Sequence, residues 1–203
     1  MTVTLTESDR FSINVKEICY GNETLEIVFG DHVLEIMPSY MGPEPLSTLI
    51  DSLNEFELGY KEDDYSTTWS DEPGCWKLKF VLDRNTFVLN ILISHYDDGL
   101  FRECKGEKEW EFSVSMPYQK YRTEVIRIAL FTLKRYGLRG INGNWCDGTD
   151  SFAINGLIRI LGSQVRFEDD KDEYYSDIFS ELDILKKALE SIDLEIPQET
   201  MEV

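Results

Sequence analysis

The chain has 203 residues, of which 42% are hydrophobic and 12% aromatic, a composition typical of a globular protein that can bury a sizeable core. Its 20 basic and 39 acidic residues give a formal net charge of −19, which argues against a grip on nucleic-acid phosphates, because that binding rests on Lys and Arg. We find no cationic, apolar leader, and the longest mostly apolar run, Phe87 to Ile93, is far below the roughly 20 residues that span a bilayer. These features predict a soluble cytoplasmic protein, with residues 1–203 in one domain and no membrane contact.

The first part of the chain predicts strands and one helix. Apolar and polar residues alternate over 11–16 and 25–29, and a third short run at 33–36 follows Gly30-Asp31 directly, which is typical of a hairpin. The segment from Pro45 to Glu57 spaces its apolar residues at helical intervals and begins with a proline suited to a first turn. We expect a short amphipathic helix there.

The clearest stretch predicts an antiparallel meander. Period-two alternation runs over 76–82, 87–93 and 109–116, and polar turns separate the three segments. Directly before the meander, Glu72-Pro73-Gly74 is interpreted as the turn that begins it, with Pro presetting φ and Gly permitting a positive φ.

The last third of the chain predicts helices. An apolar stripe covers 119–136 and ends at Gly137, a shorter helix is expected within 149–162, and a final helix with an acidic face within 173–192. The fold class is therefore α+β. We expect a single domain with a mostly antiparallel sheet of about six strands, helices packed on one face, and an acidic C-terminal helical segment at 168–203.

Candidate catalytic and metal-binding groups are few. The four cysteines are Cys19, Cys75, Cys104 and Cys146. They are scattered singly, without a CxxC pair or a neighbouring histidine, so we expect reduced thiols and no zinc site. The pair Asp97 and Asp98 follows His95 closely and would suit a metal site or a general base. Because no second His or spaced Glu completes a shell, a polar loop is the favoured interpretation. We predict no catalytic residue, no metal and no cofactor.

Calcium-loop and nucleotide-binding motifs are not supported by the sequence. The segment from Asn142 to Asp150 has the composition of a calcium loop, but placing Gly148 at the EF-hand glycine puts Trp145 at a ligand position. We interpret it as a turn before a helix, in which Trp145 is either a docking residue or a buried anchor. No GxGxxG or GxxxxGK[ST] motif appears, so nucleotide binding is not predicted.

One stretch carries a resemblance. The pattern Trp69-x-x-Glu72-Pro73-Gly74-x-Trp76-x-Leu78, followed by paired strands and an amphipathic helix that ends near Tyr136, resembles small bacterial proteins that are uncharacterised or are grouped with immunity proteins of polymorphic toxins. The resemblance covers about half of the chain, roughly 45–145, whereas the acidic segment from Glu168 departs from it. It implies a protein that sequesters a partner, with no catalytic residues to carry over.

Three functions remain open from the sequence. The first is an acidic protein-binding module, for example one of immunity type, that covers a basic toxin or effector. Its expected contact residues are acidic patches and aromatic anchors, chiefly Trp69, Asp71, Glu72, Asp97, Asp98 and Trp145, with Tyr65 and Tyr174 as further anchors. The second is an enzyme or small-ligand protein with a pocket between the sheet and helix 119–136, near His95, Asp97 and Asp98, with Asp147 or Asp150 nearby. The third is a homodimeric scaffold joined through an edge strand or the last helix.

Overall fold

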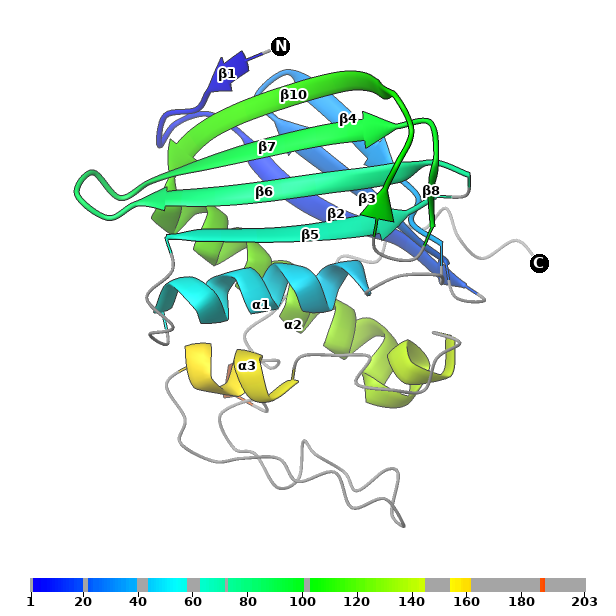
Figure 1. The fold of residues 1–203 in the computed structure, drawn as a ribbon. Coiled ribbons are helices and arrows are strands. Elements are labelled where there is room, and N and C mark those ends of the chain that lie inside the picture. Colours follow the sequence, from blue (N-terminus) through cyan, green and yellow to red (C-terminus); the bar gives the residue numbers. More distant parts are fainter. Residues whose placement is uncertain are drawn as a thin grey trace.

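The computed structural model describes residues 2–19, 22–39, 44–57, 63–71, 73–100, 103–144, 154–161 and 187–188. These residues form an α+β fold with two principal sheets and three helices below them (Figure 1). The expected α+β class is confirmed. The expected single sheet of about six strands is wrong, because the strands divide into a five-stranded and a three-stranded sheet.

The larger sheet contains the predicted meander. Its strand order is β1-β10-β7-β6-β5, and all pairs are antiparallel except the short β1, which runs parallel to β10. The strands are β1 (Thr2–Thr4), β5 (Asp64–Ser70), β6 (Cys75–Asp83), β7 (Val88–Tyr96) and β10 (Lys108–Pro117). The sequence prediction missed β1 and β5. It also assigned Phe87 to a strand, whereas Phe87 is 65% exposed with a φ of 53° just before β7.

The smaller sheet is the predicted N-terminal hairpin with one further strand pairing. It consists of β2 (Phe11–Cys19), β3 (Asn22–Phe29) and β4 (His32–Ile36) in the order β2-β3-β4, and both pairs are antiparallel. Gly30 lies between β3 and β4 with a φ of 62°, a conformation that glycine adopts without a steric penalty. The Gly-Asp turn therefore forms where the sequence predicts it.

The helices agree with the periodicity in type but not always in length. Helix α1 spans Pro45–Glu57 as expected; Glu44 caps it by accepting the Leu46 and Ser47 amides at 3.1 and 2.9 Å. Helix α2 (Tyr118–Asn144) continues past Gly137, which does not end it, and α3 (Ile154–Ile160) is shorter than expected. The predicted helix at 173–192 falls almost wholly outside the described residues.

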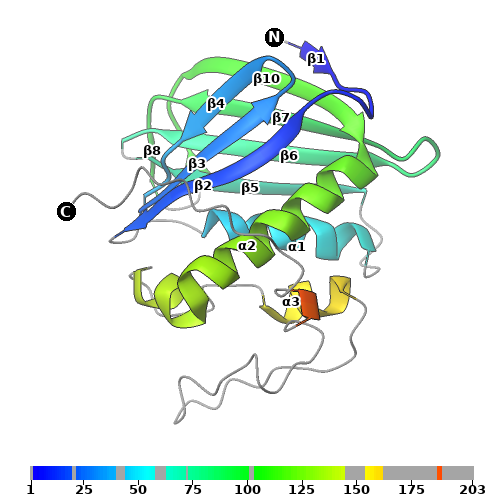
Figure 2. The ribbon, with the colours of Figure 1, turned by 180° about the vertical axis from the view of Figure 1, so that it is seen from behind.

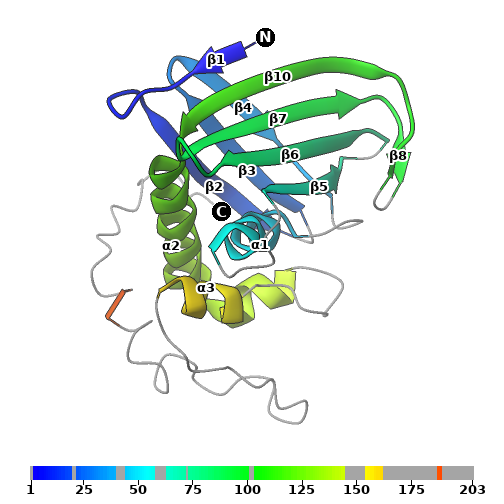
Figure 3. The same cartoon turned by 60° about the vertical axis from the view of Figure 1, so that its left-hand side comes forward.

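The hydrophobic core lies between the inner faces of the two sheets and the helices that fill their open side (Figures 2 and 3). Tyr121 of α2 packs against Phe11 of the small sheet and Phe80 of the large one, with ring centroids 6.2 and 5.7 Å apart. The cavity at this junction has a volume of about 10 Å³, roughly room for one water. Helices α1 and α2 therefore lie against the inner side of the sheets, and the described residues leave no chamber for a substrate there.

Within the described ranges, no helix is both long and apolar enough to cross a membrane.

Candidate functional site

Polar side chains lie together at two places on the large sheet, one on its inner face and one at its edge. The first place contains His95, which lies in a row of aromatic residues whose positions are set by the strand register. Trp69 of β5 pairs with Trp76 of β6, Trp76 with His95 of β7, and His95 with Trp110 of β10. Laterally adjacent residues share one face of a sheet, so these four residues lie in one row across its inner face. The ring centroids of Trp76 lie 4.6 Å from His95 and 5.0 Å from Trp110.

His95 lies between two carboxylates. Its Nδ1 is 2.7 Å from Glu109 Oε2, and its Nε2 is 3.0 Å from Asp71 Oδ2. A neutral imidazole has a single N–H, so only the imidazolium donates to both carboxylates. Because both ring nitrogens are engaged, neither is free to take a proton from a substrate in this conformation.

Asp71 fixes the other side of this network. Its Oδ2 also accepts the indole N–H of Trp76 at 2.6 Å. A Cβ on Gly74 would lie 2.4 Å from Asp71 Oδ1 and 2.9 Å from His95 Nε2, so the turn approaches the network too closely for a side chain. Gly74 is required for this space and not for a positive φ as the sequence analysis expected, since its φ lies outside the left-handed region.

Sequence reasoning did not find Glu109. The register of β10 against β7 shifts between Lys108 and Trp110, which marks a β-bulge at Glu109. A bulge places an extra residue opposite one partner and re-aims its side chain, and here the Glu109 carboxylate reaches His95. Strict alternation would put neighbouring residues on opposite faces, so no signal in the sequence indicated this contact.

Asp97 and Asp98 do not join His95. Asp97 Oδ1 accepts the Glu107 amide at 2.7 Å, and the Asp98 carbonyl accepts the amides of Lys105 and Gly106 at 3.0 and 2.9 Å. Both residues hold the segment that turns back from β7 towards β10. Their exposed side chains remain available to a partner, but the described geometry assigns them a structural role in this turn.

The same segment brings two cysteines together. It carries the short strands β8 (Gly99–Leu100) and β9 (Glu103–Cys104), and Cys104 forms a disulfide with Cys75, with Cα atoms 5.4 Å apart. The expectation of four reduced thiols is therefore wrong for this pair. The two residues are 29 positions apart without a motif, so only the fold could bring them together.

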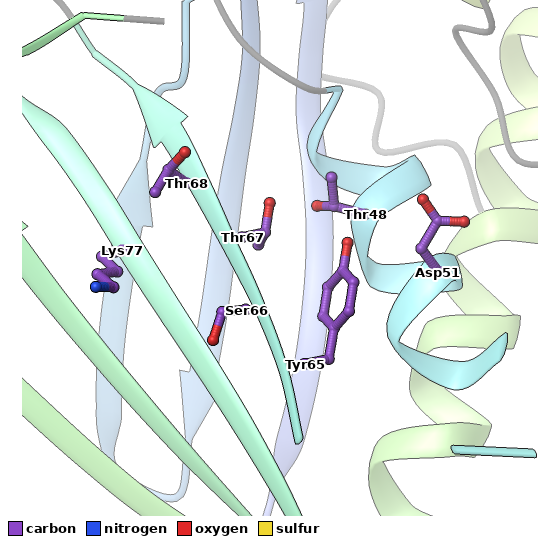
Figure 4. Close-up of a pocket in the computed structure, with 7 residues that line it drawn as sticks. All are labelled: Thr48, Asp51, Tyr65, Ser66, Thr67, Thr68 and Lys77. Carbon is purple, nitrogen blue, oxygen red and sulfur yellow. The ribbon is translucent and has the colours of Figure 1, made fainter. Parts of the chain in front are cut away.

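The second place is a groove between α1 and β5, with a volume of about 400 Å³. Thr48 and Asp51 of α1 face Tyr65 and Thr67 of β5 across it, while Ser66 and Lys77 lie on the other side of the strand (Figure 4). The lining residues are Thr48, Asp51, Tyr65, Ser66, Thr67, Thr68 and Lys77. This volume is within the range of ligand pockets, and the lining is mainly hydroxyl-bearing.

The groove runs along an open edge, because β5 is the last strand of its sheet in the part of the chain that the structure describes. The ladder to β6 includes hydrogen bonds from Asp71 N to Gly74 O and from Leu82 N to Asp63 O. Antiparallel bonding alternates along a strand, so the odd-numbered residues of β5 bond to β6 and the even-numbered ones point away. Ser70 uses its carbonyl for the Ser39 amide at 2.5 Å. Within the described residues, the backbone groups of Ser66 and Thr68 have no such partner.

In contrast, helix α2 covers the β2 edge of the three-stranded sheet. Ile13 of β2 donates its amide to Glu124 Oε1 at 2.6 Å, and its carbonyl accepts from Arg127 Nη2 at 2.7 Å. Glu124 and Arg127 also pair with each other at 2.7 Å, and Glu124 is 8% exposed. Helix α2 thus covers the edge of β2 with an ion pair, which is one way that proteins protect edge strands.

Asp51 is the charged residue on the α1 side of the groove. Burial raises the pKa of this carboxyl above 3.8, a hydrogen bond from Asn54 partly offsets the rise, and Glu55 adds to it. Within the described part of the chain, no cation lies within ion-pair distance of Asp51. Burial likewise raises the pKa of the neighbouring Tyr65, so its hydroxyl stays protonated. The groove therefore presents a partly desolvated carboxylate beside hydroxyl groups.

The structure separates the residues expected to contact a partner. Trp69 is 0% exposed and donates its indole N–H to Thr48 at 2.9 Å. It therefore holds a residue that lines the groove and has no surface that a partner could contact. Asp71 belongs to the His95 network. Glu72, Trp145 and Tyr174 lie outside the described residues, as do Asp147 and Asp150.

The described residues contain no group of three His, Cys, Asp or Glu side chains placed to hold a metal ion. No protein-family model matches the chain, and no curated protein is significantly similar to it.

Proposed function

We propose that this protein is an acidic protein-binding module that captures a basic partner, with an extended segment of that partner adding to the large sheet along β5. The observation that carries this proposal is the open edge of β5. Ser66 and Thr68 direct their backbone groups away from β6, and the groove beside them has a volume of about 400 Å³. Strand addition uses such an edge for affinity and the adjoining pockets for specificity.

The treatment of strand edges supports this role. The β2 edge is covered by Glu124 and Arg127, and β1 has three residues. By contrast, β5 has seven residues, and its hydroxyl-bearing side chains make the edge polar rather than hydrophobic. An open edge of this length promotes unwanted pairing unless it serves a partner.

Charge favours a basic protein as the occupant. The net charge of −19 would attract a cationic surface and speed its association, and it would repel a second copy of the same chain. Immunity-type sequestration of a basic toxin or effector fits this chemistry, in agreement with the resemblance at Trp69 to Leu78. A homodimer through β5 is the competing occupant of the same edge.

The test compares the wild type with Ser66→Pro. Proline lacks the N–H that the edge offers, and the Ser66 N–H points away from β6, so the variant keeps the β5–β6 ladder. Both proteins are tagged, expressed in the native host and purified at about 0.15 M and about 1 M salt, and mass spectrometry identifies the proteins that accompany them. We expect a basic protein with the wild type at low salt, released at high salt and absent from the variant.

Two further measurements decide the result. The purified partner should protect the amides of Ser66 and Thr68 from hydrogen exchange, and sedimentation should show a wild-type monomer at micromolar concentration. A partner that binds Ser66→Pro equally well contradicts the proposal. So does a wild-type dimer that this substitution converts to a monomer, because the edge would then belong to a second copy.

A further inference from the structure

Resting on this proposed function, we infer that the groove selects the side chains of the captured segment: Asp51 takes a Lys or Arg from the residue beside Thr67, and Lys77 disfavours a cation beside Thr68. The captured segment is therefore extended. Its Lys or Arg lies beside Thr67, and the neighbouring residues of the segment are not cationic. Strand geometry and the positions of Asp51 and Lys77 on opposite faces of the sheet support this inference.

Geometry fixes which residue of the segment reaches Asp51. In either strand direction, laterally adjacent residues of neighbouring strands place their side chains on the same face of the sheet. Thr67 is buried on the inner face, where α1 contributes Asp51 to the groove. A residue beside Thr67 therefore points between β5 and α1, towards the Asp51 carboxylate (Figure 4).

The next residue of the segment meets the opposite charge. Thr68 pairs with Lys77 of β6, and both lie on the outer face of the sheet. A residue beside Thr68 points to that outer face, where the exposed Lys77 ammonium repels a cation. The two charges thus act on alternate positions, which distinguishes this preference from a general attraction of basic peptides to an acidic protein.

Asp51 has the environment that such selection requires. The carboxylate is partly buried between α1 and β5, and no described cation pairs with it. Burial without an ion-pair partner disfavours its charged form, and an incoming ammonium or guanidinium would compensate that cost. The Tyr65 hydroxyl on the same side adds a hydrogen-bonding group for the incoming cation.

The test uses displayed random seven-residue peptides, selected on immobilised full-length protein and sequenced in depth. Parallel selections use Asp51→Asn, Lys77→Glu, Ser66→Pro and, as a control for loss of one acidic charge, Asp64→Asn. Asp64 is an exposed residue of the same strand and pairs with Lys79 at 3.2 Å on the outer face, away from Asp51. Among the peptides selected on the wild type, we expect Lys or Arg to be enriched at one position and depleted at the adjacent positions.

Affinities of a selected peptide, measured by fluorescence anisotropy, quantify the preference. Asp51→Asn should weaken binding about tenfold, because hydrogen bonds to charged groups contribute about that much, and Asp64→Asn less than about twofold. Replacing the peptide cation by norleucine, which keeps the aliphatic stem, should cost about as much in the wild type and little in Asp51→Asn. Lys77→Glu should relax the exclusion of cations at the adjacent positions.

The outcomes separate this inference from the proposed function. Peptides that bind the edge and fail to bind Ser66→Pro, but show no alternating charge preference or retain it in Asp51→Asn, overturn the inference and leave strand addition intact. If no peptide is enriched on the wild type over Ser66→Pro, strand addition itself fails, and the inference fails with it.

Discussion

Among single residues, the ion pair between Glu124 and Arg127 has a structural role at a strand edge, which its position on a helix would not suggest. The pair satisfies both backbone groups of Ile13 on the outer edge of β2. Removing Arg127 leaves the buried Glu124 carboxylate without its ion-pair partner and the Ile13 carbonyl without its hydrogen bond. Both residues are therefore structural rather than part of a binding surface.

We expect Arg127→Ala to lower the free energy of unfolding by about 2–3 kcal/mol. Urea denaturation measures this change. A suitable control is Lys105→Ala, which removes an exposed pair with Glu103 at 3.0 Å and should change the free energy of unfolding far less. Equal effects of the two substitutions would show that the edge contact contributes nothing beyond a surface ion pair.

Asp51 predicts a pH dependence of stability with a definite sign. Burial raises its pKa in the folded state above 3.8, so the folded protein binds more protons than the unfolded chain between the two pKa values. The contribution of Asp51 is then fully present below the unfolded pKa and is lost as the pH rises through the folded pKa. Asp51→Asn, which cannot ionise, should be more stable than the wild type at pH 7.

Urea denaturation of the wild type and Asp51→Asn at several pH values measures this difference. The advantage of the variant should shrink as the pH falls towards about 4, near the ordinary pKa of an aspartate. Asp64→Asn is the control, because that carboxylate is exposed and paired with Lys79. An advantage that does not change with pH would mean that the Asp51 carboxyl ionises as it does in the unfolded chain.

At the scale of elements, β5 is the strand on which the proposals depend. Its sequence, Asp-Tyr-Ser-Thr-Thr-Trp-Ser, contains residues that favour strands, but hydroxyl groups on both faces hide the apolar alternation. Tyr65, Thr67 and Trp69 face inwards, and their partners on β6 are the apolar Phe80, Leu78 and Trp76. A pattern based on hydrophobicity therefore finds β6 and misses β5.

The alternation of β5 predicts opposite effects of proline at neighbouring positions. Ser66→Pro removes an outward N–H and should change the free energy of unfolding by less than about 1 kcal/mol, whereas Thr67→Pro removes a ladder bond to β6 and should cost about 3 kcal/mol or more. Thermal unfolding followed by circular dichroism compares the two. If Ser66→Pro is the more damaging, the register of the open edge is shifted by one residue.

At the scale of the whole molecule, the Cys75–Cys104 disulfide ties the segment between β7 and β10 to the start of β6, next to the His95 network. A loop of this length, closed by cysteines at a sequence separation of 29, should contribute about 3–4 kcal/mol by restricting the unfolded chain. Disulfides are typical of oxidising compartments and rare in the cytosol, so the bond opposes the cytoplasmic location expected from the sequence.

The double variant Cys75→Ser, Cys104→Ser should be less stable than the oxidised wild type by this amount, and wild type kept in a strong thiol reductant should lose as much. Denaturation with and without reductant measures both. Alkylation of protein from its native host, followed by mass spectrometry, should find both thiols blocked in an oxidising compartment. Free thiols at both positions would instead place the protein in a reducing one and remove this contribution to its stability.

Several of the local elements follow from the sequence alone. Alternation at 76–82 and 109–116 and the helical spacing at 45–57 correspond to β6, β10 and α1, because side-chain periodicity follows directly from backbone geometry. Tertiary structure decided the division into two sheets, the disulfide, and the choice of Asp71 and Glu109 rather than Asp97 and Asp98 as partners of His95. It also decided that, among the described residues, the β2 edge is covered and the backbone groups of Ser66 and Thr68 on β5 have no backbone partner. These features depend on which distant segments meet, and no local period encodes that.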